Sequence, residues 1–106
     1  MDKRRVLRIP VDWEVSLRHG KQVIHGRALQ FSEFGMMVGP ADVAQVGKRY
    51  EVTFALPGHR SQFRMRGFVV YGTAKGVGVR FESVPPEVTA SFRQFVQSEI
   101  AGKPAS

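Results

Sequence analysis

The stretch that decides the fold is Val11-Asp12-Trp13-Glu14-Val15-Ser16-Leu17-Arg18, in which apolar and polar side chains alternate without exception. Successive side chains of a β-strand point to opposite faces, so such a segment packs one face on a core and shows the other to solvent. We therefore expect a half-buried strand over residues 11–18. The tight reversal His19-Gly20-Lys21 and a second apolar stretch over residues 22–31 then predict an antiparallel hairpin.

Further short strands are predicted downstream, each ended by glycine, proline or polar residues. They cover residues 36–38, 50–56, 62–72 and 77–82. Gly26 is expected to mark a bulge or bend, and Gly67 is expected to let its strand bend, because a glycine inside a strand weakens regular pairing. Short strands at this spacing favour a small antiparallel barrel or sandwich.

The period of the apolar residues becomes helical after Ser83. Pro85-Pro86 favours a helix start, and Glu87 suits the positive end of the helix dipole. The apolar residues that recur at helical spacing are Val88, Phe92, Phe95, Val96 and Ile100. The pattern predicts a helix over about residues 86–101 that covers one open end or side of the barrel, followed by a tail over residues 102–106.

Composition excludes several classes of protein. A chain of 106 residues, 42% of them hydrophobic, suits one folded domain. The absence of cysteine rules out disulfide frameworks, thiolate zinc sites and cysteine nucleophiles. No run approaches the roughly twenty apolar residues of a membrane span, and the basic N-terminus is not followed by the apolar core of a signal peptide. The expected protein is soluble and cytoplasmic.

Catalytic chemistry has little support in the sequence. The acidic residues stand singly, and the three histidines lack the spacing of metal ligands. No nucleophile elbow surrounds Ser32, and Gly76-Val77-Gly78 does not open a helix as a phosphate loop requires. We therefore expect a binding protein that is not an enzyme and has no metal or cofactor.

The charge distribution points to an anionic ligand. The formal net charge is +7, and Lys3, Arg4, Arg5 and Arg8 cluster in a basic arm over residues 1–10. Guanidiniums on such an arm can fold over a ligand and offer planar forks to phosphate oxygens or to the O6 and N7 edge of guanine. A second basic group, near Arg64 and Arg66, is interpreted as a solvated surface.

Two further segments are informative together with this arm. The first is Gln30-Phe31-Ser32-Glu33-Phe34-Gly35, where Ser32 can donate to a phosphate oxygen and Gly35 can take a positive φ or admit a close backbone approach. The second is Gly76-Val77-Gly78-Val79-Arg80-Phe81, a glycine-flanked strand that closes the sheet.

In this order, the segments resemble the PilZ domain family of bacterial cyclic di-GMP receptors. The family's arm motif R-x-x-x-R is matched by Arg4 and Arg8, with Arg5 as the frequent second arginine. A terminal strand similar to G-x-G-V-x-F and an amphipathic helix extend the likeness to about residues 3–100. The second family motif, D/N-x-S-x-x-G, is met in its spacing by residues 30–35.

The resemblance implies an all-β fold with a C-terminal helix, a six-stranded antiparallel PilZ-like β-barrel over residues 11–101. The arm is expected to wrap cyclic di-GMP while the second motif holds the nucleotide from the barrel. The implied ligand-binding residues are Arg4, Arg5, Arg8, Ser32 and Gly35, with Gln30 as the departure from the pattern. The family likeness also suggests relay of the signal to a protein partner in motility or exopolysaccharide production.

Gln30 stands where the family has Asp or Asn. A carboxylate accepts from both N1–H and N2–H of guanine, whereas an amide offers one acceptor beside its own donors. Loss of a bidentate base contact costs about 1–3 kcal/mol, which weakens binding about tenfold or more.

Two alternatives remain open from the sequence. One is a PilZ domain that binds no nucleotide and acts as a protein-interaction adaptor. The other is a single-stranded nucleic-acid-binding barrel, which the inward alternation of most aromatic residues disfavours.

Overall fold

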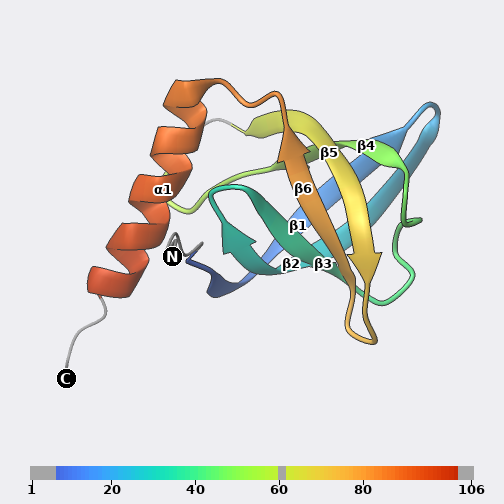
Figure 1. The fold of residues 1–106 in the computed structure, drawn as a ribbon, viewed down its shortest axis with the longest axis horizontal. Coiled ribbons are helices and arrows are strands. Elements are labelled where there is room, and N and C mark those ends of the chain that lie inside the picture. Colours follow the sequence, from blue (N-terminus) through green and yellow to red (C-terminus); the bar gives the residue numbers. More distant parts are fainter. Residues whose placement is uncertain (1–6, 60–61, 103–106) are drawn as a thin grey trace, which may run out of the picture.

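The computed structural model describes residues 7–59 and 62–102. Its strands form one closed antiparallel barrel in the order β1-β2-β3-β6-β5-β4, with a single helix after the last strand (Figure 1). The elements are β1 (Ile9–His19), β2 (Gln22–Ser32), β3 (Gly35–Gly39), β4 (Arg49–Phe54), β5 (Phe63–Gly72), β6 (Val77–Glu82) and α1 (Pro86–Ala101). The six-stranded barrel with a C-terminal helix expected from the sequence is confirmed.

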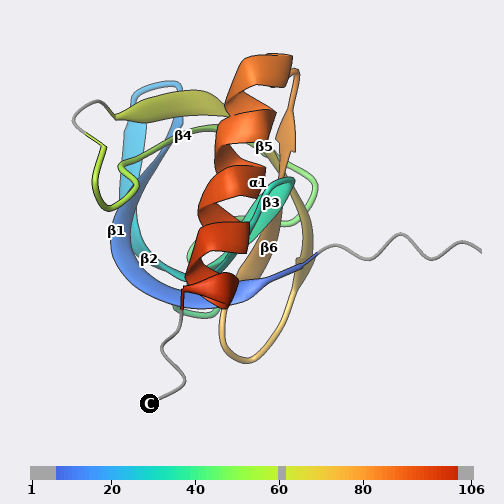
Figure 2. The same ribbon diagram turned by 90° about the vertical axis from the view of Figure 1, so that its left-hand side faces the viewer.

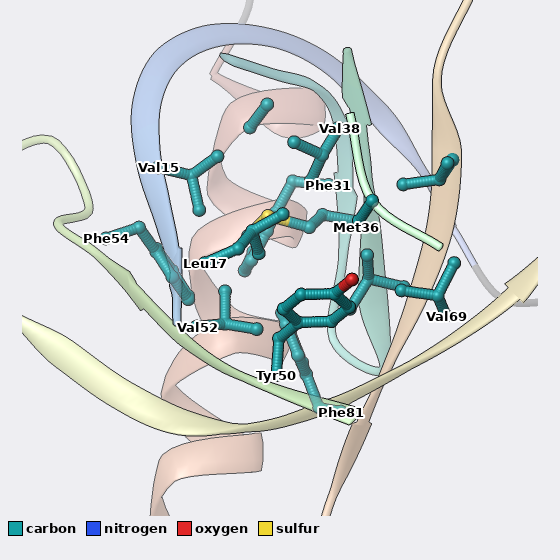
Figure 3. Close-up of a cluster of buried hydrophobic side chains, with 14 of the residues drawn as sticks. Val15, Leu17, Phe31, Met36, Val38, Tyr50, Val52, Phe54, Val69 and Phe81 are labelled. Atoms are coloured by element: carbon teal, nitrogen blue, oxygen red, sulfur yellow. The ribbon is translucent and has the colours of Figure 1, made fainter. Parts of the chain in front are cut away.

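Alternating residues of every strand supply the core. Val15 and Leu17 of β1 and Val52 and Phe54 of β4 point to the inside, as Figure 3 shows. Phe31 lies at the centre of an aromatic cluster, with its ring centroid 5.3 to 6.2 Å from those of Trp13, Phe54, Phe81, Phe92 and Phe95. These edge-to-face and tilted contacts add to the burial of apolar area that holds the barrel together.

Helix α1 lies across one end of the barrel and closes it (Figure 2). Phe92 and Val96 are buried, and Val88 and Phe95 pack against the core from its edge. Ile100 differs from the expectation, because its side chain is 48% exposed. The last turn of the helix therefore extends past the barrel wall.

Neither Gly26 nor Gly67 marks a bulge. Gly26 pairs in regular register with Val15, and Gly67 pairs with Tyr50. A Cβ on Gly67 would lie only 2.6 and 2.8 Å from the side chains of Val79 and Val52, so this position needs a glycine because the small barrel is crowded.

The register shifts lie elsewhere, within 10–13 of β1, 28–30 of β2 and 69–71 of β5. These irregularities add the bends with which a short sheet closes on itself.

Strand β1 begins two residues earlier than expected. Ile9 is 7% exposed and pairs with Phe31, so the chain is already part of the barrel at the boundary that the sequence assigned to the arm. Arg8 is thereby held next to a buried residue. Among the described residues, no helix is long and apolar enough to cross a membrane.

Candidate ligand-binding site

The turn between β2 and β3 carries the second motif. Ser32 is the last residue of β2, pairs with Gly35 of β3 and is only 6% exposed. Its hydroxyl donates to the carbonyl oxygen of Gly35 at 3.3 Å and accepts from the N–H of Phe34 at 3.2 Å. The Ser32 side chain thus stabilises the turn itself. Donation to a phosphate, as expected from the sequence, requires exchange of the bond to Gly35.

Gly35 allows the barrel to close. A Cβ at this position would collide with the carbonyl oxygen of Val79 and would lie 3.2 Å from the Cα of Arg80 on β6. The N–H of Phe81 donates to the carbonyl of Phe34 at 2.8 Å and ties the turn to the same strand. Of the two expected roles, Gly35 shows the close backbone approach and has no positive φ.

Gln30 is an exposed residue near the end of β2, where it pairs with Pro10 on one side and Met37 on the other. It directly follows the register shift of β2, which contains Leu29. The side chain of Gln30 is therefore placed on the outer surface of the barrel, beside the motif turn.

A cavity of about 220 Å³ brings four of the sequence-predicted residues together. Arg8, Gln30, Ser32 and Gly35 all line it. The other two predicted site residues, Arg4 and Arg5, lie outside the described residues. The volume is below the roughly 300–1,000 Å³ of pockets that enclose a whole ligand, so the cavity suits one part of a nucleotide.

The cavity is also lined by residues that the sequence reasoning did not assign to the site. Tyr71 of β5 and Arg80 of β6 line the cavity, and a Cβ on Gly78 would collide with the Tyr71 ring. Tyr71 is 40% exposed despite this contact. Strand alternation places Arg80 on the outer face of β6, but only closure of the barrel between β3 and β6 brings it beside Gly35.

The cavity has a positive electrostatic character. Arg8 and Arg80 line it, and none of the described residues around it is acidic. Glu33, within the motif turn, binds Arg93 of α1 instead, at 3.1 Å. Two guanidiniums around a cavity without a carboxylate favour an anionic ligand, for which phosphate oxygens are good acceptors.

A larger hollow of about 870 Å³ lies along β1 and β2 and contains none of the predicted site residues. Trp13 lines it, and its Nε1 is buried without a hydrogen-bond partner among the described residues. Glu14, Arg27 and Lys75 also line this hollow, so its charge is mixed. Within the described ranges, no group of metal-ligating side chains is large enough to hold an ion.

Comparison with solved structures shows the same fold in other bacterial proteins. The Bacillus subtilis inhibitor of motility, MotI/DgrA, matches with a TM-score of 0.78 and 16% identity over 97% of this chain and 54% of that chain. Escherichia coli YcgR in complex with cyclic di-GMP matches with a TM-score of 0.72 and 20% identity over 94% of this chain and 47% of that one. The chain thus spans about half the length of these two proteins.

A third match has the length of a single domain. The PilZ domain of Escherichia coli YcgR with cyclic di-GMP gives a TM-score of 0.67 and 17% identity over 97% of this chain and 100% of that domain. At such identities the likeness shows the fold. No curated protein matches the sequence. The family model of the PilZ domain, however, matches residues 2–98, and with the barrel, the helix and the paired motifs this establishes that the chain belongs to the PilZ domain family.

Proposed function

We propose that this chain is a non-catalytic receptor for cyclic di-GMP that passes the signal to a protein partner. The observation that supports this most directly is the cavity in which Arg8 of the arm motif meets Gln30, Ser32 and Gly35 of the second motif. Arg8 precedes the other three residues by 22 or more positions in the sequence, and their convergence around a space without acidic residues suits a dianionic nucleotide.

The end of the arm next to β1 is fixed beside the cavity. Ile9 is buried and pairs with Phe31, which holds the adjacent Arg8 at the cavity. In our proposal Arg8 contacts the part of the ligand held in the cavity, and Arg4 and Arg5 fold over the part that projects from it. Ordering of a charged segment around a ligand creates a new surface, which a partner can recognise.

The structural relatives support cyclic di-GMP as the proposed ligand and motility as the proposed process. Both YcgR structures contain cyclic di-GMP, and the Bacillus subtilis relative is described as an inhibitor of motility. We propose motility as the first process in which to look for the partner. The suggested role in exopolysaccharide production rests on the sequence likeness alone.

The test is isothermal titration calorimetry of the whole chain with cyclic di-GMP at physiological salt. We expect saturable binding at micromolar concentration or below, and about tenfold or greater weakening in Arg8→Ala, since a charge-assisted bidentate contact contributes about 1–3 kcal/mol. Arg64→Ala is the matched control. Arg64 is exposed on β5 and does not line the cavity. The affinity of the Arg64→Ala variant for cyclic di-GMP should therefore stay within about twofold of wild type.

A second candidate function is an adaptor of the same fold that binds no nucleotide. Two observations favour it: Gln30 in place of the family's Asp or Asn, and the Ser32 hydroxyl already bonded within its turn. No heat of binding from a folded sample would support the adaptor and contradict the receptor. Tight, salt-dependent binding of random oligonucleotides in preference to cyclic di-GMP would contradict both.

A further inference from the structure

Arg80 lines the cavity directly beside the second motif. Its strand, β6, pairs with β3 on one side and β5 on the other, so Arg80 has Gly35 and Phe68 as its direct cross-strand neighbours. The residue is exposed and lines the cavity. It belongs to neither of the two binding motifs, and in the terminal strand similar to G-x-G-V-x-F it stands at a variable position.

The guanidinium of Arg80 lies over the aromatic ring of Phe68. Its Cζ lies 5.6 Å from the centre of the Phe68 ring, and the Cζ of Arg49 lies 4.9 Å from the same ring. Arg49 is fixed in turn by Glu82, with its Nε 2.9 Å from one carboxylate oxygen. Stacking on a ring occupies the face of a guanidinium and leaves its N–H edges available for hydrogen bonds.

The charge of Arg80 has no counterion within the described part of the chain. Arg27, Arg49 and Arg93 each form an ion pair there with a carboxylate. Arg80 forms none, and the described residues that surround its cavity include no acid. An arginine that is positioned by stacking, unpaired and directed to a cavity is well prepared to bind an anion, because little side-chain entropy is left to lose.

We propose that Arg80 is a further ligand-binding arginine, which donates from its N–H edge to a phosphate of the cyclic nucleotide, and that Phe68 is its positioning residue. This inference rests on the proposed function. In this arrangement the nucleotide bridges the β2–β3 turn and strand β6, and it is contacted by Arg8 from the segment before β1 and by Arg80 from β6.

The experiment is calorimetric titration of cyclic di-GMP into the wild-type chain and its Arg80→Ala and Arg66→Ala variants, at two salt concentrations. Arg66 is also exposed, on neighbouring β5, but does not line the cavity, so it is a matched control for the loss of one charge. We expect Arg80→Ala to bind about tenfold more weakly and with a smaller salt dependence, because one phosphate contact is lost. Arg66→Ala should stay within about twofold of wild type.

Phe68 is tested through its dependence on Arg80. Phe68→Leu should weaken binding in the wild-type background and have no further effect in the Arg80→Ala background, whereas a purely structural role would give equal losses in both. If wild type binds and Arg80→Ala binds as tightly and with the same salt dependence, the inference is wrong and the receptor function stands. Absence of binding to the folded wild-type chain would overturn both.

Discussion

Arg93 of α1 donates from Nε and from one terminal nitrogen to the carboxylate of Glu33, at 3.1 to 3.2 Å, across 60 positions of sequence. Glu33 lies in the turn between Ser32 and Gly35, so this fork connects the C-terminal helix directly to the candidate site. The carboxylate is the less exposed partner, at 19% against 50% for the guanidinium. Helix α1 thus closes the barrel and also restrains the loop on which the second motif depends.

We predict that this ion pair has a measurable coupling energy. A double-mutant cycle with Glu33→Ala and Arg93→Ala, followed by urea unfolding, should give about 0.5–1 kcal/mol, because the contact is bidentate and partly shielded. The pair between Arg27 and Asp12 is the matched control. Its partners are 50% and 78% exposed, so its coupling should be smaller. Strictly additive effects of Glu33→Ala and Arg93→Ala would contradict a stabilising role for the fork.

Features of the fold that neighbouring residues determine could be predicted from the sequence, whereas features that depend on closure of the whole barrel could not. Strict alternation over residues 11–18 predicted β1 because burial of one face is a local property of the chain. The helix was predicted from Val88 to Val96 for the same reason. The register shift that contains Val70 was not, because it reflects closure of the whole barrel, and no local pattern of residues reports it.

The same distinction applies to the site. Gln30, Ser32 and Gly35 form one short motif, so they could be recognised together. Arg80 and Tyr71 join them only because β6 pairs with both β3 and β5, and this pairing is a property of the fold. The structure adds that Ser32 and Gly35 build the turn and the barrel closure, in addition to any contact with a ligand.

We predict that Phe31 dominates the stability of the barrel. It is fully buried, contacts five other aromatic rings and lies between Gln30 and Ser32 of the motif. Phe31→Ala should lower the free energy of unfolding by about 3–5 kcal/mol, as expected for a buried aromatic side chain. Chemical denaturation followed by tryptophan fluorescence provides the measurement, since Trp13 packs on Phe31.

The control for that experiment is Phe34→Ala. Phe34 is 47% exposed, so its loss should change the free energy of unfolding by less than about 1 kcal/mol. Equal effects of the two substitutions would show that the aromatic cluster around Phe31 is not the main source of stability.

Gly35 is predicted to be required for the fold as well as for the site. A methyl group at this position meets the backbone of β6, which cannot move without opening the barrel. Gly35→Ala should therefore destabilise the protein by about 1–3 kcal/mol, as overpacking does. Gly72→Ala is a matched comparison, because its Cβ would lie 3.6 Å from a Val46 side chain in ordinary contact. Thermal melts of the two variants that coincide would disprove the steric explanation.

Gln30 offers the sharpest test of how this chain departs from its family. The side chain is exposed at the end of β2, so a substitution changes the chemistry of the cavity with little effect on the core. Gln30→Asp supplies a carboxylate that accepts two N–H groups of guanine, and calorimetry should show cyclic di-GMP binding about tenfold tighter, equivalent to about 1.4 kcal/mol.

Gln30→Ala separates the two contributions of the position. If the amide of Gln30 makes little contact with the base, the alanine variant should match wild type within about twofold, and only the aspartate should improve affinity. A tight wild-type complex that Gln30→Asp does not improve would show that the longer amide already reaches the guanine. In that case Gln30, although it departs from the motif, preserves the contact of the motif with guanine. Ser32 must then hold the turn in the form in which Gln30 reaches the base.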